Sequence, residues 1–447
     1  MSLLQQLIAS IQQNVQKYEA AIAASGLPQP HLWEAEPYAL DDPEKAANAE
    51  AYQYMNKILA DTRAIEAIVT PSRYKVIDTA YGAIRGAAVD TAATLGVSDA
   101  IEKHGGSATL DQLSQTLNVN KNKLGRLIRL LAADFIYTET SHNTFENTRH
   151  SVALLKKTGA EFFLSLSAEE NAIAATGLYK DLTAPDTRDS FDAAKSAFSR
   201  VYLHKDQSFL EYMMSPDGAA IAAKVGAGVV PWLNRVTRGG LLHDYPWKDL
   251  SGITVVDVGA APGDSGYDVL RLNHNIKWIF QDLAAGIGML KATIPEDMQG
   301  RVQSGQISFV IQDWYEANQS QGELWYLRGV LRELDDDKAL IVLKRCAEGL
   351  RKTPGAKLVI NEILCTCPYY KPSAQGSPAV PSVSIPSPQT PLSDSGNLMS
   401  TSAVLFFGGK ERSFEEMEGL LNQAGLQIQK LYVLRTFTSM LECVLKS

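Results

Sequence analysis

The distribution of hydrophobic residues divides the chain into a helical N-terminal part and a C-terminal part in which strands and helices alternate. Residues 3–24 place apolar side chains at helical spacing on one face, and a second helical segment is predicted from Pro43 to Val69. From residue 250 onwards, short β-branched and aromatic runs indicate buried parallel strands that alternate with amphipathic helices. This alternation predicts an α/β fold in which helices cover a largely parallel sheet.

The strands of the predicted sheet are short apolar runs. The first five are Thr254–Val258, Trp278–Phe280, Ile307–Ile311, Leu324–Leu327 and Lys357–Leu364. The last two runs, Leu426–Leu434 and Thr438–Val444, are predicted to form an antiparallel pair at a sheet edge. Residues 368–397 hold seven prolines and many serines, a composition that predicts an exposed, mobile loop.

Residues 75–152 combine helices and a hairpin in the order typical of a winged helix. Val76–Leu95 is predicted to form one helix, and Ser107–Leu113 opens a short helix with a Ser/Thr cap. Lys121–Ala133 is the second helix of the pair, and residues 135–147 are expected to form the hairpin.

The basic residues of that second helix allow two interpretations. In a DNA-binding protein, Lys121, Lys123, Arg126 and Arg129 would enter a groove. In a packing module, the same charges would only solvate the outer face of the helix. The formal net charge of −8 favours the packing module and argues against nucleic acid as a partner.

The cysteines and the N-terminus indicate the compartment. Cys365 and Cys367 form a C-x-C pair, but no second Cys/His pair lies at metal-ligand spacing, so a zinc site is not expected. The first residues include neither a basic segment followed by an apolar core nor a membrane span. We therefore expect a cytoplasmic protein with reduced thiols that does not associate with membranes.

A small-residue turn after the first strand carries the clearest candidate chemistry. Gly259 and Gly263 allow the backbone to approach a ligand closely, and a helix over Ser265–Leu272 follows. The dinucleotide pattern G-x-G-x-x-G would need a glycine at Ala261, so a ligand without a pyrophosphate is favoured.

Acidic residues follow the next two strands. Asp282 ends the second strand, where a carboxylate can hydrogen-bond ribose hydroxyls, and Asp313 with Trp314 follows the third. Together with the glycine turn, these residues predict a site for an adenosine, and S-adenosylmethionine (SAM) fits it. The alternative is an α/β domain with ordinary acids at its strand ends.

Several motifs together resemble the plant and fungal small-molecule O-methyltransferases of the caffeic-acid type. The resemblance covers most of the chain and rests on Gly26-Leu27-Pro28, the winged helix, Val256–Gly259, Gln281–Leu283, Leu327–Leu331 and Gly408–Arg412. It implies a Rossmann-like SAM-dependent methyltransferase domain and an N-terminal domain that forms a homodimer. In such dimers the winged helix does not touch DNA.

The resemblance also implies domain boundaries and a cofactor site. Residues 1–155 would form the helical and winged-helix dimerisation domain, 156–248 a helical lid over a small-molecule substrate, and 249–447 the SAM-binding domain with the loop at 368–397. In the family the glycines line the methionine end of SAM, and the acids hold its ribose and adenine. The implied cofactor-binding residues are Gly259, Gly263, Asp282, Asp313, Trp314 and Arg328.

The chain departs from this family at the base. The family's stretch L-R-H-x-L-H-D-W contains the histidine that accepts the phenol proton, and Arg332 stands at that position here, followed by Glu333. Arginine has a pKa above ~12 and cannot accept a proton near neutrality. The carboxylate that orients the base falls at Asn361, or at Glu362 after a slip of one residue, and the second supporting acid is kept as Glu411.

Loss of the base is also a feature of fungal pericyclases built on this fold, which form pyridone alkaloids while retaining SAM. By that resemblance, Arg332 would polarise a substrate carbonyl, and Glu333, Glu411 and His150 are candidates for a dehydration step. We expect a pericyclase that closes a pyridone quinone methide by an Alder-ene or hetero-Diels–Alder reaction. A methyltransferase with an unusual base and a non-catalytic binding protein remain as alternatives.

Overall fold

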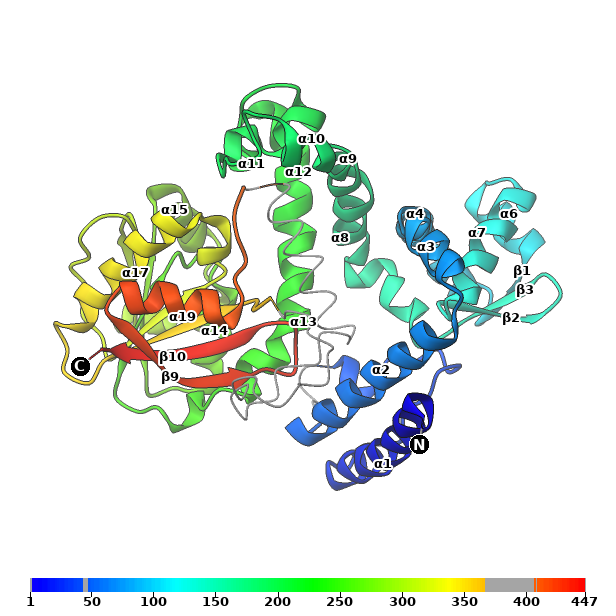
Figure 1. The fold of residues 1–447 in the computed structure, drawn as a ribbon, viewed down its shortest axis with the longest axis horizontal. Helices are drawn as coiled ribbons and strands as arrows, with labels where there is room; N and C mark the ends of the chain where they lie inside the picture. Colours follow the sequence, from blue (N-terminus) through cyan, green and yellow to red (C-terminus); the bar gives the residue numbers. More distant parts are fainter. Residues whose placement is uncertain (1, 43–46, 366–405, 407, 447) are drawn as a thin grey trace. The chain divides into compact units, whose positions relative to one another are not determined.

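The computed structural model describes residues 2–42, 47–365, 406 and 408–446, which form two compact units, Met1–Val236 and Thr237–Ser447 (Figure 1). The proline-rich segment predicted at 368–397 lies outside the described residues.

The N-terminal unit opens with two long helices, α1 (Leu3–Ala24) and α2 (Ala49–Val69), which lie side by side (Figure 1). Ile22 of α1 and Ala51 of α2 belong to one buried cluster. Part of the apolar face of α1 therefore packs on α2 of the same chain and is not available to a partner subunit. Ile8 of α1 remains exposed.

The predicted helix over Val76–Leu95 is two helices, and this prediction was wrong. α3 (Ser72–Ala80) ends at Tyr81, and α4 starts at Gly82. Glycine is a poor helix former, and no other side chain lies within 4 Å of the position that a Cβ on Gly82 would take. Neither helix propensity nor packing therefore favours a single continuous helix across Gly82.

The winged-helix order is present. Residues Ser107–Thr109, predicted as the start of a helix, instead form a strand that pairs with the hairpin, and Thr109 caps the helix that follows through a capping box. The elements after α4 are α5 (Val97–Lys103), β1 (Ser107–Thr109), α6 (Leu110–Leu117), α7 (Lys121–Ala133), β2 (Tyr137–Ser141) and β3 (Thr144–Asn147).

Short helices with three π-helical turns complete the N-terminal unit. The π turns are Ser167–Asn171, Ser199–Leu203 and Val225–Val229. The α-helices are α8 (Ala160–Leu166), α9 (Ala172–Ala175), α10 (Leu178–Thr183), α11 (Phe209–Met213), α12 (Ala219–Lys224) and α13 (Val230–His243), the last of which continues into the second unit.

The C-terminal unit contains a seven-stranded sheet in the order β6-β5-β4-β7-β8-β10-β9. The first five strands in this order are parallel, and β10 and β9 are antiparallel at one edge, which confirms the α/β fold and the terminal antiparallel pair. The strands are β4 (Thr254–Val258), β5 (Lys277–Asp282), β6 (Ile307–Ile311), β7 (Leu324–Arg328), β8 (Lys357–Glu362), β9 (Leu426–Val433) and β10 (Ser439–Leu445).

Helices cover both faces of this sheet, and successive residues of each strand face opposite sides. Val256, Trp325 and Ile360 face α17 (Asp336–Leu350) and α19 (Phe414–Gln423), whereas Val255 and Tyr326 face the other side. The helices on that other side include α14 (Asp264–Leu272) and α15 (Ala284–Ala292), and the short α16 (Gln299–Gln303) precedes β6. Among the described residues, no helix has the length and apolarity to cross a membrane.

Candidate active site and cofactor site

The candidate site residues of the C-terminal unit lie where the parallel strands end. Val258 pairs with Gln281, Asp282 with Ile311, and Arg328 with Asn361, so the carboxyl ends of β4 to β8 meet at one edge of the sheet. In open α/β sheets, ligands bind in the crevice outside these ends.

The turn after β4 needs its two glycines for conformational reasons. Gly259 has φ of 72° and Gly263 has φ of 92°, values that other residues rarely adopt. A Cβ on Gly259 would lie 2.8 Å from Val330 and 2.9 Å from the indole ring of Trp314. The structure therefore brings the glycine turn and Trp314, two features predicted separately from the sequence, into contact.

Asp282 is half-buried beside the same turn. Its Oδ2 accepts a hydrogen bond from the amide of Ala261 at 3.0 Å, and its Oδ1 accepts one from the amide of Leu283 at 2.8 Å. A Cβ on Gly286 would overlap this carboxylate, so that glycine makes room for it. A carboxylate has about four acceptor sites, and these two bonds leave acceptor capacity for ribose hydroxyls.

Asp313 and Arg328 support the local backbone. Asp313 Oδ1 accepts from the amide of Tyr315 at 2.9 Å, which fixes the turn that carries Trp314. The guanidinium of Arg328 donates to Asn361 Oδ1 at 3.2 Å and to Thr237 Oγ1 at 2.9 Å. Arg328 thus links the end of β7 to β8 and α13.

The candidate reactive group follows β7. Arg332 lies in a short 3-10 turn, Leu331–Glu333, and its Nη2 is 2.8 Å from Oε1 of Glu411. The Glu411 side chain is completely buried, while 20% of the Arg332 side chain is exposed. Oε2 of Glu411 is buried and has no hydrogen-bond partner in the part of the chain that the structure describes. The arginine therefore shields a carboxylate from solvent and retains an exposed surface of its own.

Glu362 is the functional candidate that the sequence analysis left undecided against Asn361. Its Oε1 accepts a hydrogen bond from the amide of Leu331 at 2.8 Å, and its side chain is buried. Strand alternation places Glu362 on the face of Leu358 and Ile360, whereas Asn361 lies on the opposite face. The alternation of side chains along the strand is the signal in the sequence that assigns these two residues to opposite faces of the sheet.

Three carboxyl groups lie near Arg332, and burial is the largest influence on the pKa of each. Burial raises the pKa of Glu333 to about 7, of Glu411 to about 7 and of Glu362 to about 6, and the positive charge of Arg332 opposes each shift. Near neutral pH, this cluster can therefore both hold and release protons.

His150 belongs to the N-terminal unit and lies just after β3, where the surrounding chain covers only part of the residue. Partial burial lowers its pKa, and the neighbouring guanidinium of Arg149 lowers it further. The structure brings Arg332, Glu333 and Glu411 together within the C-terminal unit, and the role of His150 remains a prediction.

Comparison with known families assigns both units. Residues 77–157 match the O-methyltransferase dimerisation domain, and residues 234–427 match the O-methyltransferase domain. Together the two matches span more than half of the chain. The chain therefore belongs to the O-methyltransferase family.

Known proteins agree with this assignment. The chain is 26% identical over 376 residues to O-methyltransferase tpcA of Aspergillus fumigatus, a match that covers 76% of each protein. Its fold is similar to that of LepI in complex with SAM, with a TM-score of 0.67 at 18% identity over 88% of this chain and 94% of that one. A structure described as a pericyclic reaction enzyme has a TM-score of 0.66 at 18% identity and the same coverage.

SAM is the cofactor of this methyltransferase family, which confirms the cofactor predicted from the sequence. The residues at the strand ends fit it, because the acceptor capacity of Asp282 suits a ribose and the glycine turn lacks the pattern for a pyrophosphate. Gly259, Gly263, Asp313 and Trp314 lie around the same strand ends and would complete the site.

Replacement of Asp282 by Asn tests the cofactor site. We expect Asp282→Asn to weaken SAM binding by ~1–3 kcal/mol, because a charged acceptor of hydrogen bonds is lost. Isothermal titration with SAM and S-adenosylhomocysteine measures the change. Asp297→Asn removes an exposed carboxylate that pairs with Arg271 and serves as the control. Equal affinity of wild type and Asp282→Asn would contradict the assignment.

The raised pKa of Glu411 predicts a pH dependence of stability. The folded-state pKa of about 7 exceeds the ordinary value of 4.5, so the fold favours the protonated carboxyl. Its contribution to stability is present below about pH 4.5 and is lost as pH rises through about 7, with a slope of at most about 1.4 kcal/mol per pH unit.

We expect Glu411→Gln to flatten the fall in the free energy of unfolding of the C-terminal unit between pH 5 and about pH 7.5. Denaturant unfolding at a series of pH values measures the slope. The exposed Glu418 on the following helix provides a matched control, Glu418→Gln. An unchanged slope in Glu411→Gln would show that burial does not raise this pKa.

Proposed function

We propose that the chain is a SAM-binding pericyclase that dehydrates a pyridone alcohol and directs pericyclic closure of the resulting quinone methide. One observation carries the proposal. At the position of the family's base, the chain has Arg332, which is paired with buried Glu411 and cannot accept a proton near neutral pH. A pericyclic step requires no base.

An arginine at this position can instead lower the activation barrier of the reaction by electrostatic stabilisation. The guanidinium is a planar fork of hydrogen-bond donors, and 20% of the Arg332 side chain is exposed. A hydrogen bond from Arg332 to a substrate carbonyl would withdraw electrons from the attached diene. In a desolvated site, such a preorganised donor stabilises developing negative charge much more than it would in water.

The neighbouring carboxyls have the proton affinity that a dehydration needs. A protonated Glu333 or Glu411 can donate its proton to the departing hydroxyl, while an ionised carboxylate accepts the proton of the pyridone hydroxyl. Water leaves, the quinone methide forms, and the ring closure that follows is an isomerisation. His150 stays a candidate for either proton transfer.

The cofactor would contribute charge. Bound SAM supplies a sulfonium cation, which adds positive potential next to the substrate without losing its methyl group. Asp282 and Asp313 would hold its adenosine at the same edge of the sheet as Arg332. The fold shared with LepI and with the pericyclic reaction enzyme is consistent with this use of a methyltransferase scaffold.

Methyl transfer to a phenolic substrate is the second candidate function. The related proteins named O-methyltransferases support it, and Glu333, with a pKa raised to about 7 by burial, has the proton affinity of a base that works near neutrality. A binding protein without catalytic activity is the third candidate.

Replacement of Arg332 separates these functions. We expect Arg332→Ala to lose ~2–4 kcal/mol of transition-state stabilisation, the range for one preorganised donor, with a smaller effect on substrate binding. Arg332→Lys should recover part of the loss because it keeps the charge but not the fork. Turnover of a pyridone alcohol with a diene side chain, followed by mass spectrometry, measures the effect.

The mass of the product identifies the reaction class. Loss of water or isomerisation indicates a pericyclase, and a gain of one methyl group on a pyridone or phenol indicates methyl transfer. Arg271→Ala removes a more exposed, ion-paired arginine of the same unit and should retain turnover. If Arg332→Ala stays within about twofold of the wild-type rate, the electrostatic role is refuted.

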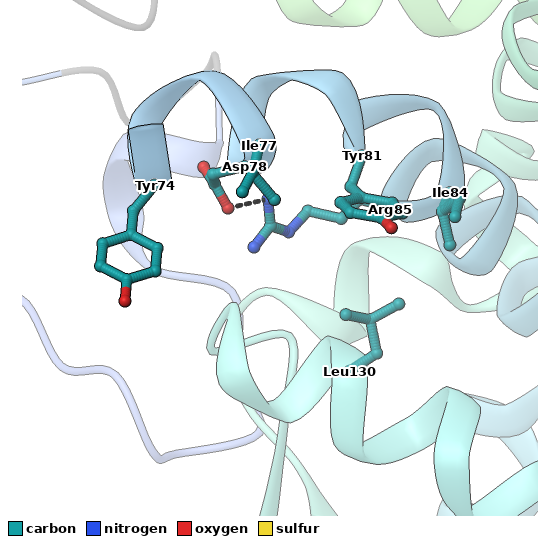
Figure 2. Close-up of a pocket in the computed structure, with 7 residues that line it drawn as sticks. All are labelled: Tyr74, Ile77, Asp78, Tyr81, Ile84, Arg85 and Leu130. Atoms are coloured by element: carbon teal, nitrogen blue, oxygen red, sulfur yellow. Dashed lines mark hydrogen bonds and ion pairs between the residues drawn. The ribbon is translucent and has the colours of Figure 1, made fainter. Parts of the chain in front are cut away.

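We also propose that the chain is a homodimer joined through α3 and α4. Tyr74, Ile77, Tyr81 and Ile84 are each more than half exposed, although they are large and apolar. They line a groove of about 450 Å³ together with Leu130 of α7, as Figure 2 shows. Apolar patches of this kind mark protein interfaces, and the matched dimerisation domain begins within this patch.

The groove carries charges that can order such an interface. Asp78 and Arg85 form an ion pair of 2.6 Å within it (Figure 2), and Arg85 also lies 3.1 Å from Asp134. In a twofold dimer the same patch is used by both subunits, so Arg85 of each subunit could approach the acidic residues of the other.

Charge introduced into the patch should dissociate the dimer. We expect the double variant Tyr81→Glu and Ile84→Glu to be monomeric at micromolar concentration, because two buried carboxylates would lack partners in the interface. Light scattering measures the mass. Tyr179→Glu changes a more exposed aromatic residue outside the patch and should leave the dimer intact. A monomeric wild type would contradict the proposal.

A further inference from the structure

A fully buried arginine lies behind the candidate reactive turn. Arg412 is 1% exposed, and its Nη1 donates to the carbonyl of Leu331 at 2.8 Å while its Nη2 donates to the carbonyl of Leu334 at 2.9 Å. Its Nε donates to Oδ1 of Asp336 at 2.8 Å. These two carbonyls belong to the residues on either side of Arg332 and Glu333.

The segment that carries Arg412 contacts the same turn in two further ways. A Cβ on Gly409 would overlap the carbonyl oxygen of Arg332 and lie 3.0 Å from the backbone of Glu333, so the two backbones touch. Glu411 pairs with the Arg332 side chain. One short segment therefore binds the backbone of the reactive turn and the side chain that projects from it.

The segment is itself anchored to the sheet. Arg412 forms a bridge with Leu364, beyond the end of β8, and its carbonyl accepts from the amide of Cys365 at 2.9 Å. On the other side of the turn, Glu362 of β8 accepts from the amide of Leu331. The turn after β7 is thus fixed to the end of the neighbouring strand through both its amide and its carbonyl groups.

Removing the charged guanidinium of Arg412 from water costs free energy, so its burial indicates that the hydrogen bonds it makes are important for this part of the fold. A buried guanidinium is tolerated only when its donors are paired, and a well-packed apolar side chain would fill the same space at no desolvation cost. The rigid fork of arginine can meet two carbonyls three residues apart, a geometry that the single ammonium of lysine cannot match.

We propose that Arg412 is a positioning residue that fixes the Leu331–Leu334 backbone and thereby the direction of the Arg332 guanidinium. The inference rests on the proposed function in one respect, because Arg332 is the group assigned to the substrate. The placement of the turn by Arg412 can be measured without any substrate.

Hydrogen exchange tests the placement directly. In the full-length protein with SAM, Arg412→Met should increase exchange at the amides of Arg332 and Glu333 at least about tenfold, since their turn loses two of its carbonyl contacts. Arg412→Lys should restore part of the protection. Exchange at these amides equal to that of the wild type would overturn the inference.

Turnover of the pyridone alcohol probe tests the functional consequence. We expect Arg412→Met to lower kcat by about 10- to 100-fold, as for a displaced reactive group, while KM and the affinity for SAM stay within about twofold. In an Arg332→Ala background the same change should have little further effect, because the two residues act as one unit. Additive losses in this double-mutant cycle would refute action through Arg332.

Two controls separate positioning from general loss of stability. Glu442→Gln removes a buried carboxylate that binds Tyr245 and Lys357 in the same unit, and it should lower stability while turnover is kept. Gly409→Ala should reduce kcat by pressing on the Arg332 carbonyl, whereas Gly349→Ala, which overlaps the Trp325 ring, should only destabilise. Equal rate losses in both glycine variants would contradict the inference.

The outcomes distinguish this inference from the proposed function. If Arg332→Ala leaves turnover unchanged, the proposed role of Arg332 fails, and the exchange experiment still decides whether Arg412 holds the turn. If Arg332→Ala lowers turnover but Arg412→Met does not, the proposed function stands and the positioning role is refuted.

Discussion

The ion pair between Arg332 and the buried Glu411 is the interaction on which the candidate site depends. A guanidinium and a carboxylate removed from water each incur a large desolvation cost, and their mutual attraction offsets it only when geometry and further hydrogen bonds are good. Glu333 and Glu362 are two further acidic groups near Arg332, and burial has raised the pKa of each. The cluster thus combines a permanent positive charge with protons that are exchangeable near neutrality.

The parallel sheet explains why this cluster and the cofactor residues share one edge. Every crossover returns the chain to the same side, so the turns after successive strands converge at the carboxyl ends. Asp282 is the last residue of β5 and Arg332 follows β7, and these two strands lie on either side of β4 and its glycine turn. Arg332, the residue that stands where the family has its base, therefore lies at the same edge of the sheet as the candidate cofactor residues.

The sequence predicted most elements of the C-terminal unit because strands and helices differ in the period of their apolar residues. The prediction failed at places where the residues nearby in the sequence give no clear signal. The break at Tyr81 and Gly82 lies within an alanine-rich run whose helical pattern continues across it. The apolar face of α1 was visible in the sequence, but periodicity within one helix does not say which other helix that face contacts.

The sequence by itself determined the α/β order, the glycine turn and the acids at the strand ends, since these are properties of residue type and spacing. That Arg332 stands where the family has its base follows from the resemblance to the O-methyltransferases. Only the tertiary structure decided which carboxylates meet that arginine. Glu411 and Arg332 are far apart along the chain, and the contact of Arg412 with two backbone carbonyls has no sequence signature. Long-range packing, which sets burial and therefore the pKa values, converts separate residues into a site.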